Sequence, residues 1–285
     1  MAVGSPPTVR RRQLGRELRR LREDAGLLAE ALAERLHCSP SRVSRIETAR
    51  IRIGPGTVHE ILDALGVHGD ERARLVALAR EAEEPGWWQA YTDALPLPYA
   101  TYISLESEAV SLKAFEPTLV YGLLQTREYA RAVIEPGARH QQPSEVAARI
   151  EARLARQRVL TKPDPVRLHV VLDEAVLHHA VGGHEVLRAQ LQRLVELARR
   201  PNVTIQVLPF EKSSALVFFP GPVVIMGFPD PDAPPVMYLE SVATDLYVER
   251  PETVQAHLDL YDRLVEQALS PSRSIRKIQS LLTGI

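Results

Sequence analysis

A short segment near the N-terminus places serines and arginines at helical spacing. Ser39 and Pro40 are typical of the N-cap and the first position of a helix. The outward face of the helix that this pattern predicts carries hydroxyl and guanidinium groups: Ser41, Arg42, Ser44 and Arg45. Such groups bind phosphate oxygens and the edges of guanine in a DNA major groove. This face therefore predicts contacts with double-stranded DNA, which Pro40 at the start of the helix would share.

More arginines lie on either side of this segment. Arg50 and Arg52 follow the predicted helix, and Arg10, Arg11 and Arg12 precede it in a stretch that we expect to be a flexible basic arm, residues 1–12. Residues 1–52 hold 12 arginines against 6 acidic residues, whereas the whole chain has a net charge of −1. A basic head on an acidic body indicates a polyanionic partner. The alternative is an arginine-rich helix face that is merely solvated.

The elements that would position these arginines are helices. Apolar residues at helical spacing predict five short helices between residues 13 and 82, which is a compact all-α domain. Two of these helices, 28–36 and 39–47, are joined by a tight turn at His37 and Cys38. Small Ala33 allows the two helices to cross closely, and the pattern is a helix-turn-helix. An inert helical bundle with this pattern by chance is the alternative.

This block resembles the helix-turn-helix of the Xre/Cro/repressor family, whose pattern is close to L-T-Q-x-x-L-A-x-x-L-G-V-S-x-S-x-V-S-R-I-E. The segment Val43-Ser44-Arg45-Ile46-Glu47 matches directly, as do Leu32-Ala33 and Leu36, and the resemblance covers residues 13–82. It implies a recognition helix at about 39–48, in which Pro40, Ser41 and Arg45 read bases and Arg42 and Ser44 lie nearer the phosphates. It also implies a scaffold ion pair between Arg22 and Glu47.

The sequence departs from that pattern at the start of the first helix of the motif and in the turn. Leu28 and Ala29 replace the N-cap threonine and the phosphate-binding glutamine at the start of the first helix of the motif. A cap is worth about 1 kcal/mol, so this helix starts with less support. His37 replaces the turn glycine, and we expect it to adopt a positive φ at modest cost.

Residues 87–285 predict a second, larger domain. Helices are expected at about 99–115, 126–134, 144–160, 184–200, 252–269 and 272–282, and strands at 166–172, 203–208, 223–228, 236–239 and 246–248. Helices, then strands, then helices indicate an α+β regulatory and dimerisation domain with a mostly antiparallel sheet.

Part of this second region also resembles a known block. Gly122-Leu-Leu-Gln-Thr126, with Tyr129 and Ala130, is similar to the (V/I)-P-G-L-L-Q-T-x-x-Y-A segment of actinobacterial Xre-type regulators described as antitoxin-like; Tyr121 replaces the proline. The resemblance implies a domain that senses a ligand or a small partner protein. Tyr121, Gln125 and Tyr129 are candidates for that contact, and a packing corner between two helices is the alternative.

The sequence offers little for catalysis or metal binding. His178, His179 and His184 lie close to Asp173 and Glu174, but their spacing matches no metal motif, and we expect solvated or helix-capping histidines. An enzyme built on this group is a third alternative, but the residues form no catalytic constellation, so we expect neither catalysis nor a cofactor. The single cysteine, Cys38, excludes a disulfide framework.

Together these patterns predict a cytoplasmic, sequence-specific transcriptional regulator without enzymatic activity. One recognition helix covers too few base pairs for genomic specificity, so we expect a homodimer on a near-palindromic operator. The alternative is an antitoxin-like protein whose main role is to bind a small partner protein, with DNA binding for autoregulation. No apolar run is long enough to span a membrane, and residues 1–18 lack the pattern of a secretory signal.

Overall fold

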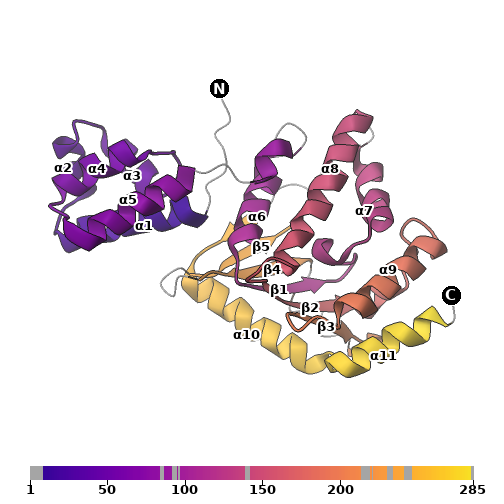
Figure 1. Cartoon of the computed structure of the whole chain (residues 1–285). Coiled ribbons are helices and arrows are strands. Elements are labelled where there is room, and N and C mark those ends of the chain that lie inside the picture. The colour runs from indigo at the N-terminus through magenta and orange to yellow at the C-terminus, as the bar shows by residue number, and fades with distance from the viewer. Residues whose placement is uncertain are drawn as a thin grey trace. The chain divides into compact units, whose positions relative to one another are not determined.

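The structure is a computed structural model, and it describes residues 9–83, 87–91, 95, 97–138, 142–212, 219, 221–229, 234–240 and 246–283. The chain divides into two compact units. The first comprises Met1–Thr92 and Pro96–Leu105, and the second comprises Asp93–Leu95 and Glu106–Ile285. The first unit is helical and the second carries a mixed sheet with helices (Figure 1). The predicted fold class, an N-terminal all-α domain followed by an α+β domain, is confirmed.

The described part of the first unit begins with the five helices that the sequence predicts. They are α1 (Val9–Asp24), α2 (Ala29–Arg35), α3 (Pro40–Glu47), α4 (Pro55–Ala64) and α5 (Gly69–Glu83). Helix α1 packs against α3 and α5, and α2 packs against α3. Their apolar stripes meet in one buried core that includes Leu14, Leu18, Leu32, Val43, Ile46, Leu62 and Leu75. Burial of these side chains is the main force that holds the short helices together, because helices of this length are marginal alone.

The basic stretch before residue 13 differs from the expectation. Helix α1 already begins at Val9, so Arg10, Arg11 and Arg12 lie in its first turns and not in a flexible arm. Arg11 is buried, and Arg10 donates from Nη1 to the main-chain oxygen of Glu81 at 3.3 Å. Contacts with the end of α5 extend the helix toward the N-terminus.

A 3₁₀ turn at Trp87–Tyr91 and helix α6 (Leu97–Glu108) follow. The expected helix at 99–115 is wrong in its second half, because α6 ends at Glu108 and strand β1 (Ser111–Glu116) comes next. Strand β1 lies in the middle of the sheet, where pairing on both sides outweighs the helix propensity of its leucine, lysine and alanine.

The sheet of the second unit has six described strands. They are β1, β2 (Arg167–Asp173), β3 (Val203–Leu208), β4 (Val223–Gly227), β5 (Val236–Leu239) and β6 (Leu246–Val248), in the order β3-β2-β1-β4-β5-β6. The pairings β1–β4, β4–β5 and β5–β6 are antiparallel, as expected, whereas β1–β2 and β2–β3 are parallel. The sheet is therefore mixed.

Helices make the crossovers between the parallel strands. Helices α7 (Arg127–Ile134) and α8 (Pro143–Arg156) connect β1 to β2, and α9 (His184–Leu197) connects β2 to β3. The carboxyl ends of β1, β2 and β3 therefore share one edge of the sheet.

The chain continues after the sheet with α10 (Pro251–Gln267) and α11 (Pro271–Leu282). Helix α10 lies along one face of the sheet (Figure 1), where Tyr261 and Leu264 join a core with Phe115 and Val171. Within the described ranges, none of the helices combines the length and apolar character that crossing a membrane requires.

Candidate nucleic-acid interface

Helix α3 begins with a complete N-terminal cap. The Ser39 hydroxyl oxygen accepts a hydrogen bond from the main-chain nitrogen of Arg42 at 3.2 Å, and Pro40 occupies the first helical position. Val43 and Ile46 are buried against the other helices of the first unit. Because a helix repeats every 3.6 residues, burial of these two positions turns the remaining side chains outward.

The outward face of α3 is open to solvent. Its exposed residues are Pro40, Ser41, Arg42, Ser44 and Arg45. The guanidinium of Arg45 folds back along the helix, and its Nε donates to the main-chain oxygen of Ser41 at 3.3 Å. The bond leaves the guanidinium on the exposed face, beside the serine hydroxyls. These side chains supply fork-shaped donors and small hydroxyls on one convex surface, as the sequence predicts.

The turn before α3 and the loop after it both contain residues with positive φ. His37 has φ of 50°, as expected for a residue that replaces the turn glycine, and Ala49 has φ of 56°. The main-chain nitrogens of His37 and Cys38 donate back to Glu34 and Ala33, which closes the turn between α2 and α3. The positive φ costs some backbone strain at His37. The packing of α2 against α3, whose angle this turn sets, offsets that strain.

Gly15 determines how closely α1 approaches α3. A Cβ at Gly15 would lie 2.6 Å from the main-chain oxygen of Glu47 and 2.9 Å from that of Ile46. Both atoms belong to backbone that cannot move aside like a flexible side chain, so only glycine fits here. The sequence alone does not identify this residue. A glycine inside a helical pattern can be recognised as a close contact only when the element packed against it is known.

Arg22 and Glu47 form the ion pair that the resemblance implies. Arg22 donates from Nε to Oε1 of Glu47 at 2.6 Å and from Nη2 to Oε2 at 2.9 Å. Its Nη1 also donates to the main-chain oxygen of Leu27 at 2.7 Å. The hydrogen bonds that Arg22 donates to Glu47 raise the pKa of Arg22. One buried guanidinium thus joins α1, the start of the turn into α2 and the end of α3.

A second group of arginines lies where α1 begins and the chain leaves α3. Arg50 and Arg52 are exposed, and Arg52 donates from Nη2 to the main-chain oxygen of Glu83 at 2.6 Å. Burial lowers the pKa of Arg11, and the nearby positive charge of Arg52 lowers it further.

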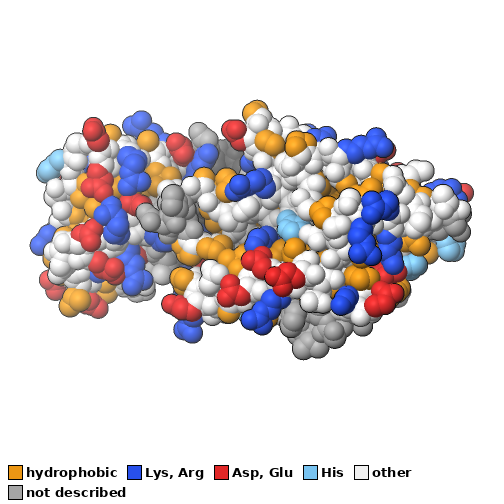
Figure 2. Space-filling model, turned by 90° about the horizontal axis from the view of Figure 1, so that it is seen from below, with side chains coloured by type: hydrophobic (Ala, Val, Ile, Leu, Met, Phe, Trp, Pro, Cys, Tyr) orange, Lys and Arg blue, Asp and Glu red, His pale blue; other side chains and the backbone are white. Residues whose placement is uncertain are grey.

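The α1–α5 side of the first unit is balanced in charge. Glu17 accepts from Arg20 at 3.1 Å and from Arg74 at 2.7 Å, and Arg20 also reaches Glu71 at 2.6 Å. Figure 2 shows acidic and basic side chains interleaved on the face of this unit in view. Arginines on this side are therefore largely neutralised, unlike those on α3.

Helix α2 lacks the support that the related helices have. Leu28 occupies the N-cap position in an extended conformation, its side chain makes no capping bond, and it is 72% exposed. The departure at Leu28 and Ala29 thus leaves the first amides of α2 without a side-chain acceptor at the cap. The start of α2 therefore carries an exposed apolar residue where the pattern in the sequence leads one to expect a polar cap.

In the second unit, the segment around Gly122 is an internal corner. Tyr121, Gln125 and Tyr129 are 2%, 3% and 0% exposed. Gln125 donates to the main-chain oxygen of Val120 at 2.7 Å, and the hydroxyl of Tyr129 accepts from the Val120 nitrogen at 3.2 Å. These internal contacts favour the packing-corner interpretation over direct contact with a ligand or partner.

A buried ion pair supports this corner. Arg156 donates from Nε and Nη2 to the two carboxylate oxygens of Glu106, at 2.8 and 2.7 Å, and the hydroxyl of Tyr121 donates to the same carboxylate at 3.1 Å. Gly122 passes directly over the guanidinium, since a Cβ there would lie 3.4 Å from its nitrogens. The corner is therefore organised by a charged pair that is closed to solvent.

Glu116 at the end of β1 carries a second, half-buried carboxyl. Burial raises its pKa to about 8, and the negative charge of Glu240 contributes to the increase. The folded protein therefore holds this proton more tightly than the unfolded chain, in which a glutamate has a pKa near 4.3. The contribution to stability is fully present below the unfolded pKa, near 4.3, and is lost progressively as the pH rises from there to about 8.

We therefore expect the free energy of unfolding to fall between about pH 5 and pH 8 and to level off above pH 8, with a slope of at most about 1.4 kcal/mol per pH unit from this group. Urea unfolding followed by circular dichroism at a series of pH values measures it. Glu116→Gln is expected to flatten the dependence, whereas Glu185→Gln, on the exposed surface of α9, is expected to leave it unchanged. Equal slopes in wild type and Glu116→Gln would contradict the assignment.

The histidines and carboxylates singled out from the sequence do not come together as a metal site. Asp173 caps the following 3₁₀ turn by accepting from the Ala175 nitrogen at 2.8 Å. Glu174 accepts from Lys277 at 2.6 Å, and His178 stacks on Phe210. Across the ranges that the structure describes, no three His, Cys, Asp or Glu side chains are grouped to hold a metal ion.

Comparison with known proteins covers both units. A family model described as a helix-turn-helix domain matches residues 13–75. A second model, described as "Domain of unknown function (DUF5753)", matches residues 99–280. Searches of curated proteins and of solved structures return no match. The helix-turn-helix match contains the whole of α3 and the elements that position it.

Proposed function

Because the chain belongs to the DUF5753 family and joins that domain to a helix-turn-helix DNA-binding domain, we propose that it is a sequence-specific transcriptional regulator of the Xre type. It acts as a homodimer on a near-palindromic operator. The observation that carries the proposal is the exposed face of α3, where Ser41, Arg42 and Arg45 stand on a helix that is fixed from behind.

The geometry of the first unit supports this use of α3. The Arg22–Glu47 pair and the close contact at Gly15 hold the helix without drawing on its outward residues. A recognition helix binds its site more specifically when its side chains stand on a rigid element, because less conformational freedom is lost on binding. The proposed base contacts come from Pro40, Ser41 and Arg45, and the proposed phosphate contacts come from Arg42 and Ser44.

The arginines around α3 support a role in backbone contacts. Arg50 and Arg52 follow the helix, and Arg10, Arg11 and Arg12 begin α1. The internal bonds of Arg10 and Arg52 fix these two side chains, and the exposed Arg50 completes a positively charged border next to α3.

The second unit is assigned dimerisation and the sensing of a ligand or small partner protein, without catalysis. Dimerisation follows from the small number of base pairs that one helix covers. Sensing requires that the ligand or partner bind the DNA-competent state with a different affinity from the other state. A regulator of this kind works where the DNA is, so we place it in the cytoplasm.

The proposal is tested by selecting bound sequences from random DNA with the purified protein. Recovery of two inverted half-sites whose centres lie about one helical turn apart, or a multiple of it, supports a homodimeric helix-turn-helix regulator. Recovery of no common sequence would contradict specific binding. The spacing also reports how the two copies of the first unit are held.

Arg45 and Arg42 are expected to respond differently to replacement. Arg45→Ala is expected to cost about 1–3 kcal/mol on the selected operator and to relax the preference at one base pair, because a bidentate base contact is lost. Arg42→Ala is expected to weaken operator and random DNA alike and to reduce the slope of log K against log salt by about one. Fluorescence anisotropy titrations at several salt concentrations measure both.

Arg80→Ala, on the exposed surface of α5, is the matched control, and it is expected to leave both quantities unchanged. Equal weakening of operator and random DNA by Arg45→Ala would show that Arg45 touches only the DNA backbone. A salt slope that none of the variants changes would show that these arginines do not neutralise phosphates.

A further inference from the structure

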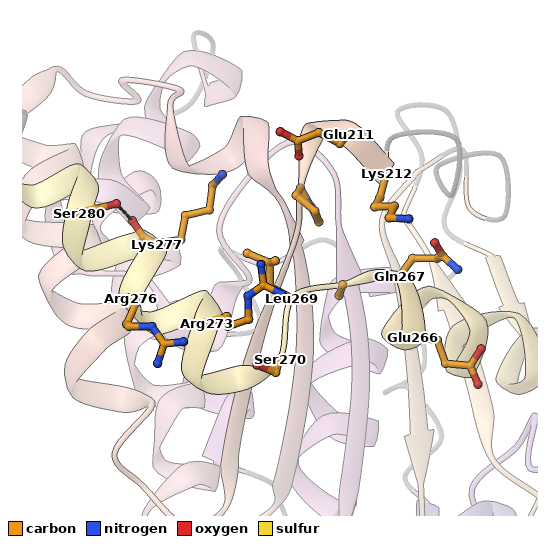
Figure 3. Close-up of a pocket in the computed structure, with 12 residues that line it drawn as sticks. Glu211, Lys212, Glu266, Gln267, Leu269, Ser270, Arg273, Arg276, Lys277 and Ser280 are labelled. Atoms are coloured by element: carbon orange, nitrogen blue, oxygen red, sulfur yellow. Dashed lines mark hydrogen bonds between the residues drawn. The ribbon is translucent and has the colours of Figure 1, made fainter.

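The second unit contains an open cleft of about 900 Å³ between the end of β3, the end of α10 and helix α11. Figure 3 shows Arg273, Arg276 and Lys277 along α11 on one side and Lys212 on the other. Pro209, Ala268 and Leu269 contribute an apolar lining. The volume lies in the range of small-molecule sites.

The rim of this cleft is held rigidly by buried polar groups. Ser274 in the first turn of α11 is fully buried, and its hydroxyl accepts from the main-chain nitrogen of Val207 at 2.9 Å. The main-chain nitrogen of Leu269 donates to the oxygen of Val207 at 2.8 Å, and the side chain of Gln206 donates to the oxygen of Leu269 at 2.9 Å. The start of α11 is thus fastened to the edge strand β3.

The cationic side chains of the cleft are only partly compensated. Lys277 pairs with Glu174 at 2.6 Å. In the described parts of the chain, no carboxylate forms an ion pair with Lys212, Arg273 or Arg276. Glu211 and Glu266 also line the cleft, and Figure 3 shows Glu266 at the end away from the α11 arginines. Lys and Arg side chains gather over α11 in the space-filling view (Figure 2).

The N-terminus of α11 adds further donors. Ser270 precedes the helix and its side chain makes no capping bond. The first helical residue is Pro271, and the main-chain nitrogens of Ser272 and Arg273 come next in the first turn, where a helix has no acceptor of its own. The positive end of the helix dipole thus lies beside two guanidiniums.

We propose that this cleft binds a small anion that carries phosphate groups. Arginine guanidiniums hold phosphate oxygens with paired hydrogen bonds, and the amides at the helix start bind a further oxygen. Lys212, across the cleft, meets a second negative group of the same molecule. A diphosphate spans such a site better than a single phosphate does, because charges approach it from two sides.

The cleft suits a compact ligand better than a DNA backbone. It is a concave pocket with a mixed lining, in which Pro209, Ala268 and Leu269 supply an apolar part, whereas duplex phosphates form an extended convex edge that needs an open, uniformly basic surface. The inference deepens the proposed sensing role of the second unit and rests on that role only for its consequence at DNA. Binding itself is measured without DNA, so its failure is distinguishable from failure of the regulator proposal.

The experiment uses the full chain and inorganic pyrophosphate as the probe, with sodium chloride added to equal ionic strength. Isothermal titration and thermal melting are compared among wild type, Arg273→Glu/Arg276→Glu and the control Arg188→Glu/Arg263→Glu. The control changes two exposed arginines outside the cleft by the same charge. We expect wild type and control to bind pyrophosphate and melt at a higher temperature with it, and the cleft variant to lose at least about tenfold in affinity.

Four outcomes would overturn the inference. One is the absence of pyrophosphate binding to wild type at millimolar concentration, and another is equal binding by the cleft variant. The third is equal affinity for citrate, which would show general attraction of anions without selection for phosphate. Weaker operator binding by the cleft variant with no pyrophosphate present would place these arginines on DNA, and would likewise contradict a small-ligand site.

Discussion

Replacing Arg156 with alanine is expected to remove about 3–5 kcal/mol from the stability of the second unit, because a buried carboxylate loses its countercharge. Glu106 and Arg156 are almost fully buried and joined by two hydrogen bonds. After the substitution, the described partner that remains for the Glu106 carboxylate is the hydroxyl of Tyr121. The total free energy of unfolding of such a domain is about 5–15 kcal/mol. The variant is therefore expected to be only marginally stable.

Urea unfolding followed by circular dichroism measures the loss. If Arg156→Ala does not accumulate as folded protein, two further variants decide the matter. Tyr121→Phe removes one hydrogen bond and is expected to cost about 1 kcal/mol. Arg156→Met combined with Glu106→Leu replaces the pair with apolar side chains of similar size and is expected to recover most of the stability. A double variant as unstable as Arg156→Ala would show that the charges themselves are required.

Arg22→Ala is expected to destabilise the first unit by a similar amount, about 3–5 kcal/mol, since it breaks a buried pair and frees the main-chain oxygen of Leu27. The two tryptophans of the chain, Trp87 and Trp88, lie in this unit. Tryptophan fluorescence during denaturant unfolding therefore reports on it separately.

The surface pair Arg19–Glu23 provides the comparison, because both side chains are more than half exposed. Arg19→Ala is expected to cost less than about 1 kcal/mol. Arg22→Lys keeps the charge without the two-pronged geometry and is expected to fall between the two variants. If Arg22→Ala leaves the unfolding curve in place and weakens only DNA binding, Arg22 contacts DNA and is not part of the scaffold.

The helix-turn-helix could be predicted residue by residue because its determinants are local. The cap at Ser39, Pro40 at the first position and the spacing of Val43 and Ile46 specify α3 within ten residues of sequence. The antiparallel strands β4, β5 and β6 are also short alternating or apolar runs bounded by turn residues, and the sequence places them correctly.

Features that depend on distant partners were not predicted. Strand β1 contains helix-forming residues, and it is a strand because β2 and β4 pair with it from both sides. The parallel pairing of β1, β2 and β3 follows from crossovers whose direction the local pattern does not contain. The burial of Arg11 and the need for glycine at position 15 depend in the same way on α5 and α3.

The candidate contacts of the second unit illustrate the same limit. Tyr121, Gln125 and Tyr129 stood out because their segment is distinctive, but a distinctive segment can serve the interior as well as the surface. The cationic cleft, in contrast, combines Lys212 with residues of α11 that are about 60 positions away in the sequence. No local pattern would have joined them.

On α3, the residues that stabilise the fold are different from the residues that face solvent, and this has a consequence for evolution. Its inner positions, with Gly15 and the Arg22–Glu47 pair, carry the folding energy, while Ser41, Ser44 and Arg45 carry almost none of it. The outer side chains are therefore interchangeable without structural penalty. Under the proposed function, exchange of these three surface residues alone would redirect the protein to a different DNA sequence and leave the fold of the first unit unchanged.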